Sequence, residues 1–199
     1  MRQIPLAIAP EAQPDFDNYV PGANAAALSH LRSLSWPAAP IYLWGPASCG
    51  KTHLLRACAA AYHDAVATPD LEEVTVPGDT PPRVAVDNVE ALSGAGQIAL
   101  FNLFNHLRAT GGRLLTTASL PPRQLPLRED LRTRLGSGLI YRLHPLSDSE
   151  KVSALKAQAA ARALPLPQEA LTYLLARAPR DMRSLSGLLA ALDRYSLEQ

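Results

Sequence analysis

Residues 45–52 have the sequence GPASCGKT, which fits the pattern G-x-x-x-x-G-K-[ST] at every fixed position. Glycines at these places let the backbone turn tightly, so that its N–H groups can point at phosphate oxygens. An apolar run, 41–44, precedes the pattern, and a helical pattern follows it. This order predicts a buried parallel strand, a phosphate-binding loop and a helix whose N-terminus faces the phosphate.

Every position of this loop, and the residue after it, is a candidate for nucleotide contact: Gly45, Pro46, Ala47, Ser48, Cys49, Gly50, Lys51, Thr52 and His53. We expect the Lys51 ammonium to neutralise the β- and γ-phosphates and the Thr52 hydroxyl to bind Mg²⁺. A structural glycine-rich turn is the alternative, and the flanking strand and helix disfavour it.

A second apolar run, residues 84–86, ends in Asp87. We expect this carboxylate to lie beside the loop and to help hold Mg²⁺; the alternative is an aspartate that caps the following turn. Many hydrolysing P-loop proteins carry a second acid directly after this aspartate, where this chain has Asn88. An amide can orient water but cannot accept its proton, and Glu90 is expected to point elsewhere, so we predict weak or absent hydrolysis by the isolated chain.

Hydrophobic periodicity predicts helices over 24–34, with Asn24 as N-cap, 52–62 and 97–109, and strands over 41–44, 84–86, 114–117 and 139–143. Residues 64–82 allow at most a short strand. After Pro145 the pattern is helical only, over 147–163, 169–178 and 182–195, and Ser147 to Glu150 matches a capping box. The prediction is an α/β parallel sheet flanked by helices and followed by a small all-helical lid domain.

The composition limits the function classes. The net charge of +1 argues against a polyanion binder by bulk charge. No apolar run approaches the roughly 20 residues of a membrane-spanning helix, and the N-terminus lacks the pattern of a signal peptide, so a cytoplasmic location is expected. The two cysteines, Cys49 and Cys58, form no metal-binding spacing with the histidines and are expected to be reduced.

Several segments in order resemble the DnaA-related AAA+ family: the phosphate loop, the acidic strand end, a strand ending in polar residues at 116–119, the segment LRTRL at 131–135, and the helical lid. The segment FDNYVPG at 16–22 is similar to the family's opening motif, which lines the adenine pocket. The likeness runs from about Phe16 to the end of the chain. It implies a P-loop AAA+ module over 16–145, a lid over 146–199 and an extended arm over 1–15.

The resemblance also implies residue roles. Arg134 matches the arginine finger, which would act in trans on a neighbouring subunit's nucleotide; a surface arginine paired with Glu129 or Asp130 is the alternative. Arg183 matches the lid arginine called sensor 2, with Arg180 as a competitor. Thr117 matches sensor 1.

Two features favour the Hda-type regulators within this family over the initiators. The chain ends soon after the lid, whereas initiators continue into a helix-turn-helix domain, and the N-terminal QIPLAI resembles a peptide that binds the DNA sliding clamp, with Gln3, Leu6 and Ile8 as contacts. This implies ADP or ATP with Mg²⁺ as cofactors, DnaA and the polymerase III clamp as partners, and an indirect association with DNA at the nucleoid. A homo-oligomer, an autonomous ATPase or small-molecule kinase, and a helicase loader stay open as alternatives.

Overall fold

The computed structural model describes residues 13–33, 39–72, 74, 81–179 and 181–197. The chain divides into two compact units, an α/β unit formed by Pro14–Pro145 and a helical unit that includes Leu146–Gln199. Each unit has its own hydrophobic core, and we describe them separately.

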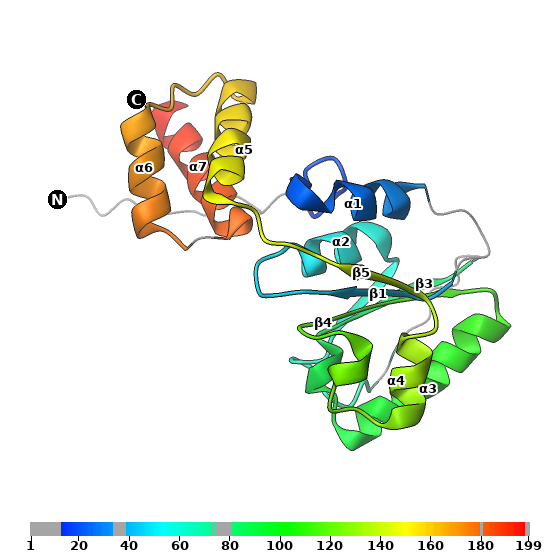
Figure 1. Ribbon diagram of the computed structural model, residues 1–199. Helices are drawn as coiled ribbons and strands as arrows, with labels where there is room; N and C mark the ends of the chain where they lie inside the picture. Colours follow the sequence, from blue (N-terminus) through cyan, green and yellow to red (C-terminus); the bar gives the residue numbers. More distant parts are fainter. Residues whose placement is uncertain (1–12, 34–38, 73, 75–80, 180, 198–199) are drawn as a thin grey trace. The chain divides into compact units, whose positions relative to one another are not determined.

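The α/β unit is built on a five-stranded sheet in which every neighbouring pair of strands is parallel (Figure 1). The strand order is β2-β3-β4-β1-β5, with β1 at Ile41–Trp44, β2 at Ala61–Asp64, β3 at Arg83–Asp87, β4 at Arg113–Ala118 and β5 at Leu139–Arg142. Because the strands are parallel, their carboxyl ends meet at one edge of the sheet, where open α/β sheets bind ligands.

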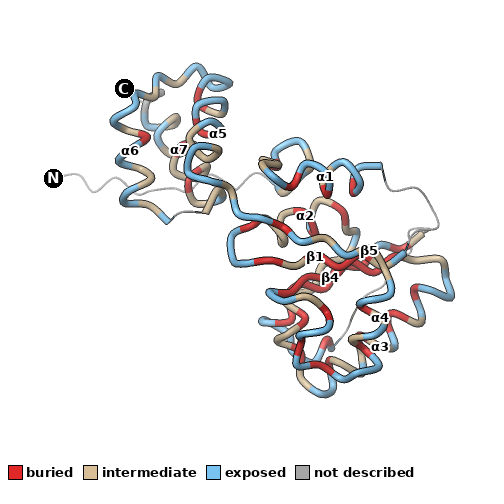
Figure 2. The backbone as a smooth tube through the Cα atoms, viewed as in Figure 1, coloured by how far each residue is buried: buried red, intermediate tan, exposed pale blue. Residues whose placement is uncertain are grey.

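Helices cover both faces of this sheet (Figure 1). One face carries α1 (Ala25–Arg32) and α2 (Lys51–Cys58), and the other carries α3 (Gly94–Ala109) and α4 (Glu129–Leu135). Short 3₁₀ turns lie at Gly22–Asn24, Val89–Ala91 and Pro122–Gln124. The strands at the centre are buried (Figure 2).

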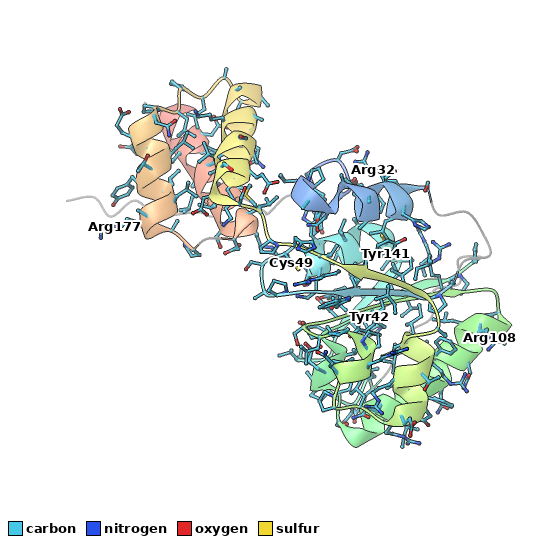
Figure 3. The ribbon with its side chains drawn as sticks, in the orientation of Figure 1. Arg32, Tyr42, Cys49, Arg108, Tyr141 and Arg177 are labelled. Carbon is cyan, nitrogen blue, oxygen red and sulfur yellow. The ribbon has the colours of Figure 1, made fainter. Side chains whose placement is uncertain are left out.

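Strand β1 shows why a buried strand of this sheet appears in the sequence as a continuous apolar run. Ile41 and Leu43 pack with α1 and α2, whereas Tyr42 between them packs with α3 and α4. Figure 3 shows Tyr42 on the side of the sheet that carries α3 and α4. Successive side chains of a strand point to opposite faces, so a strand that is covered on both faces is apolar at every position. The strands predicted at 41–44 and 84–86 are confirmed.

The predicted helix 52–62 is wrong at its end, and a strand was missed there. Helix α2 stops at Cys58, Ala59 is extended, and the Ala60 N–H donates to the Arg83 carbonyl at 3.0 Å. Ala61–Asp64 then pairs with β3 as strand β2. Pairing with a buried strand outweighs the helical tendency of an alanine-rich segment, because local propensity is a weak preference that tertiary contacts override.

Asn24 stands at the N-cap position of α1, as predicted, but its side chain makes no capping hydrogen bond. Instead Nδ2 donates to the His144 carbonyl at 2.8 Å, and Oδ1 accepts from the His144 N–H at 2.7 Å. The buried amide therefore joins the first helix of the α/β unit to the segment after β5. The helix α4 at Glu129–Leu135 was not predicted from periodicity.

The helical unit contains α5 (Asp148–Ala161), α6 (Gln168–Arg177) and α7 (Met182–Leu197). The predicted capping box at the start of α5 is confirmed, because Ser147 and Glu150 each accept from the other's backbone N–H. These bonds from Ser147 lower the pKa of the Glu150 carboxyl. The core of the unit consists of residues from all three helices, namely Leu155, Ala159, Leu171, Leu185 and Leu189. None of the described helices is long and apolar enough to cross a membrane.

Candidate functional site

The loop between β1 and α2 has backbone angles that depend on its glycines. Gly45 has φ +154° and Gly50 has φ +92°. A Cβ on Gly45 would lie 2.4 Å from the Leu143 carbonyl oxygen, and one on Gly50 would lie 2.6 Å from Cε2 of Tyr19. Both positions therefore require glycine. The reason is the close approach of neighbouring atoms to these two residues as much as their backbone conformation.

Lys51 opens helix α2, and its side chain turns back over the loop. Its Nζ donates to the carbonyl oxygens of Gly45 at 2.8 Å and Pro46 at 2.9 Å. The ammonium thus lies against the same backbone turn that the sequence assigns to phosphate. Cys49 lies in this turn (Figure 3) and is a buried free thiol, with its Sγ 3.9 Å from the same Nζ.

Asp87, at the carboxyl end of β3, accepts hydrogen bonds from three hydroxyl groups. Its Oδ2 accepts from Thr52 at 2.6 Å and from Tyr62 at 2.8 Å, and its Oδ1 accepts a short hydrogen bond from Thr117. Asp87 is only 1% exposed. Three residues predicted separately from the sequence, Thr52, Asp87 and Thr117, therefore form one cluster. Its hydroxyl and carboxylate oxygens are the ligands that Mg²⁺ prefers.

Asn88 follows Asp87 in a left-handed conformation, with φ 56° and ψ 49°. Its N–H donates to the Thr117 hydroxyl at 3.0 Å, and its side-chain Nδ2 donates to Asp64 at 3.0 Å. The amide is thus held by the end of the neighbouring strand β2. Glu90 turns to the end of β4, where its carboxylate accepts from the Ser119 N–H at 2.7 Å.

Sequence reasoning missed Tyr62 and Asp64, the two β2 residues that touch Asp87 and Asn88. Tyr62 was predicted to end a helix, and Asp64 to open a segment with at most a short strand, because four half-buried residues give no apolar run. Burial, and then the nearby Asp87 carboxylate, raise the pKa of Tyr62 to about 12, so its hydroxyl stays protonated and donates.

The opening segment covers one side of the loop. The Tyr19 ring lies 5.3 Å from the His53 ring, and its hydroxyl accepts from Asn24 at 3.3 Å. His53 Nε2 lies 2.8 Å from the Asp15 carbonyl oxygen. The segment at 16–22, which the resemblance assigns to the adenine pocket, therefore packs against the start of α2 through Tyr19.

Arg134 lies in the last turn of α4, and its guanidinium carbon lies over aromatic rings of α3. Its Cζ is 4.2 Å from the centre of the Phe101 ring and 5.4 Å from that of Phe104. No ion pair joins Arg134 to Glu129 or Asp130 in the described part of the chain, where Asp130 pairs with Arg128 at 3.0 Å.

Other predicted site residues lie elsewhere. Arg183 is the second residue of α7 and belongs to the helical unit. Gln3, Leu6, Ile8 and Arg180 lie outside the described residues.

The comparison with family models matches residues 148–199 to the model described as "Hda, lid domain". Domain III of DnaA from Thermotoga maritima shares the fold, with a TM-score of 0.69 at 21% identity, over 96% of this chain and 92% of that one. AMPPCP-bound DnaA from Aquifex aeolicus gives a TM-score of 0.66 at 21% identity, over 96% and 70%. The chain has the AAA+ fold of DnaA, followed by an Hda-type lid.

The match to the Hda lid covers α5, α6 and α7 of this AAA+ protein. The fold class predicted from the sequence, a P-loop AAA+ module with a helical lid, is confirmed. Protein NMB1076 from Neisseria meningitidis is 36% identical over 61% of this chain and 85% of its own, with a TM-score of 0.41.

Proposed function

We propose that this AAA+ protein is an Hda-like negative regulator of replication initiation, which stimulates ATP hydrolysis by DnaA in trans. The observation that carries the proposal is the Hda lid at 148–199 behind a module with the DnaA AAA+ fold. The chemistry would take place at the partner's nucleotide, and this chain would supply the activating side of the interface.

The chain's own site fits ADP or ATP with Mg²⁺. The loop amides and Lys51 would hold the phosphates, and Thr52 and Asp87 would face the Mg²⁺, which shields phosphate charge when bound. Thr117 contacts Asp87 directly, in keeping with a sensor 1 role. Arg183 would contact the phosphates from the lid as sensor 2.

Intrinsic hydrolysis should be weak. The position that would need a base carries Asn88, and its amide donates to Asp64 rather than standing free. The autonomous ATPase is the competing function, favoured by the complete set of Lys51, Thr52 and Asp87. Steady-state turnover of the purified chain separates the two, because a rate of roughly 1 s⁻¹ or more would be that of an ordinary enzyme and would contradict the regulator.

Arg134 would act as the arginine finger. Its place on α4 without a carboxylate partner in the described residues leaves the charge available to an anion. The test is Arg134→Ala in a reaction with DnaA-ATP, clamp and DNA. We expect stimulated hydrolysis to fall by ~10³-fold or more, the loss typical of such arginines. Arg123→Ala, an exposed arginine of the nearby 3₁₀ turn, is the matched control and should stay active.

The N-terminal peptide would bring the regulator to the sliding clamp through Gln3, Leu6 and Ile8. This part rests on the sequence, since these residues lie outside the described ranges. A pull-down on the clamp should succeed with the full chain and fail after Gln3→Ala with Leu6→Ala. Equal capture of both proteins would contradict clamp binding and favour a loader-type AAA+ protein.

A further inference from the structure

Phe101 and Phe104 stand one turn apart on α3 and form the surface on which Arg134 lies. Phe104 is 6% exposed and belongs to the core cluster, and Phe101 is half-buried against the same cluster. Leu131 and Leu135, on either side of Arg134 in α4, are also buried. Both helices are thus anchored where the guanidinium meets the rings.

A guanidinium that stacks on a ring uses its flat face. Its five N–H donors project from the edge of the plane and stay available to an anion. The attraction between the cation and the ring electrons also fixes a long side chain that would otherwise sample many rotamers. Stacking therefore restricts where the charge lies without using the groups that would bind phosphate.

We propose that Phe101 is a positioning residue for Arg134, which holds the guanidinium by its face and presents its N–H edge to the phosphates of a partner's nucleotide. The inference rests on the proposed function, in which Arg134 reaches that nucleotide. Phe101 lies on a different helix, α3, and would act in the stimulated reaction only through Arg134. Phe101 is chosen over Phe104 because its ring lies nearer to Cζ and is not fully enclosed in the core.

The test measures hydrolysis of DnaA-bound ATP at increasing concentrations of this chain, with clamp and DNA present. It compares Phe101→Leu, which keeps an apolar side chain without a ring, with Phe101→Tyr, which keeps the ring. A third variant carries trifluorophenylalanine at position 101, which keeps the shape but withdraws electron density from the ring face. Ile98→Ala, at an exposed position of the same helix, is the control.

We expect Phe101→Leu and the fluorinated ring to lower the maximal rate by about three- to tenfold, the size that a partly exposed cation–π contact supports. The half-saturating concentration should not change, and Phe101→Tyr and Ile98→Ala should behave like the original chain. In an Arg134→Ala background, Phe101→Leu should cause no further loss. The fluorinated variant keeps the packing, so a folding defect cannot produce this pattern.

Two results would overturn the inference and leave the proposed function standing: a loss of rate with Arg134→Ala but none with Phe101→Leu or the fluorinated ring, or a change confined to the half-saturating concentration. An Arg134→Ala chain that stimulates normally would instead remove the arginine finger, and with it the proposed function on which the inference depends.

Discussion

Asp87 shows how single residues set the chemistry of this edge of the sheet. A carboxylate with almost no exposure is costly unless it is well bonded, and here hydroxyls from α2, β2 and β4 all donate to it. The pattern in the sequence identified Thr52 and Asp87 because each follows its own strand. It could not identify Tyr62, because that contact depends on a neighbouring strand which no local signal revealed.

Gly50 is expected to tolerate no side chain. Gly50→Ala would have to keep φ near +92° and would place its Cβ against the Tyr19 ring. We expect the free energy of unfolding to fall by roughly 1–3 kcal/mol and nucleotide affinity to fall with it. Chemical denaturation and calorimetry measure the two effects. Gly94→Ala is the control, since its Cβ would meet nothing within 4 Å, and an equal loss there would contradict the argument.

The thiol of Cys58 should be unreactive in the folded chain. Burial raises its pKa to about 12, against the smaller opposite effects of Arg83 and Arg113, and burial also raises the pKa of Cys49. Only the thiolate reacts with iodoacetamide, so alkylation of Cys58 at pH 8 should be at least about 100-fold slower in the native protein than in the same protein unfolded in guanidinium. Mass spectrometry follows the reaction, and similar rates in both states would disprove the expectation.

At the scale of elements, whether the sequence predicted a helix or strand correctly depended on how completely that element is buried. Strands β1 and β3 are covered on both faces, so apolar runs predicted them. Strand β2 at the sheet edge is half-buried at all four positions, and no periodicity distinguished it from the end of α2. Helix α4 has seven residues, too few for a helical period to stand out. The missed elements are therefore those that tertiary contacts create.

The capping box is an element-scale feature that can be tested alone. Ser147→Ala removes the acceptor of the Glu150 N–H at the start of α5 and should lower the stability of the helical unit by about 1 kcal/mol. Thermal unfolding followed by circular dichroism gives the change. Ser153→Ala is the control, because its hydroxyl bonds only to the backbone of the preceding turn. If both serines matter equally, capping is not the cause.

At the scale of the whole molecule, nucleotide binding should act on stability by mass action. A ligand present at 100 times its dissociation constant stabilises the folded state by about 2.7 kcal/mol, enough to raise the unfolding temperature by several degrees. We expect this shift with ADP and Mg²⁺, and none in Lys51→Ala. Lys156→Ala, an exposed lysine of α5, should keep the shift. Scanning calorimetry measures the unfolding temperature. If ADP and Mg²⁺ did not raise the unfolding temperature of the original chain, nucleotide binding would be contradicted.

The strand order also determines what would happen if the chain were divided. Strand β1 comes early in the sequence yet lies between β4 and β5, which come late. A break between β2 and β3 would leave one fragment with β1 and the other with both of its neighbours, so neither could complete a sheet by itself. The two fragments would have to associate before Gly45, Lys51 and Asp87 could form one site. Recovery of nucleotide binding after mixing the fragments would therefore measure their complementation.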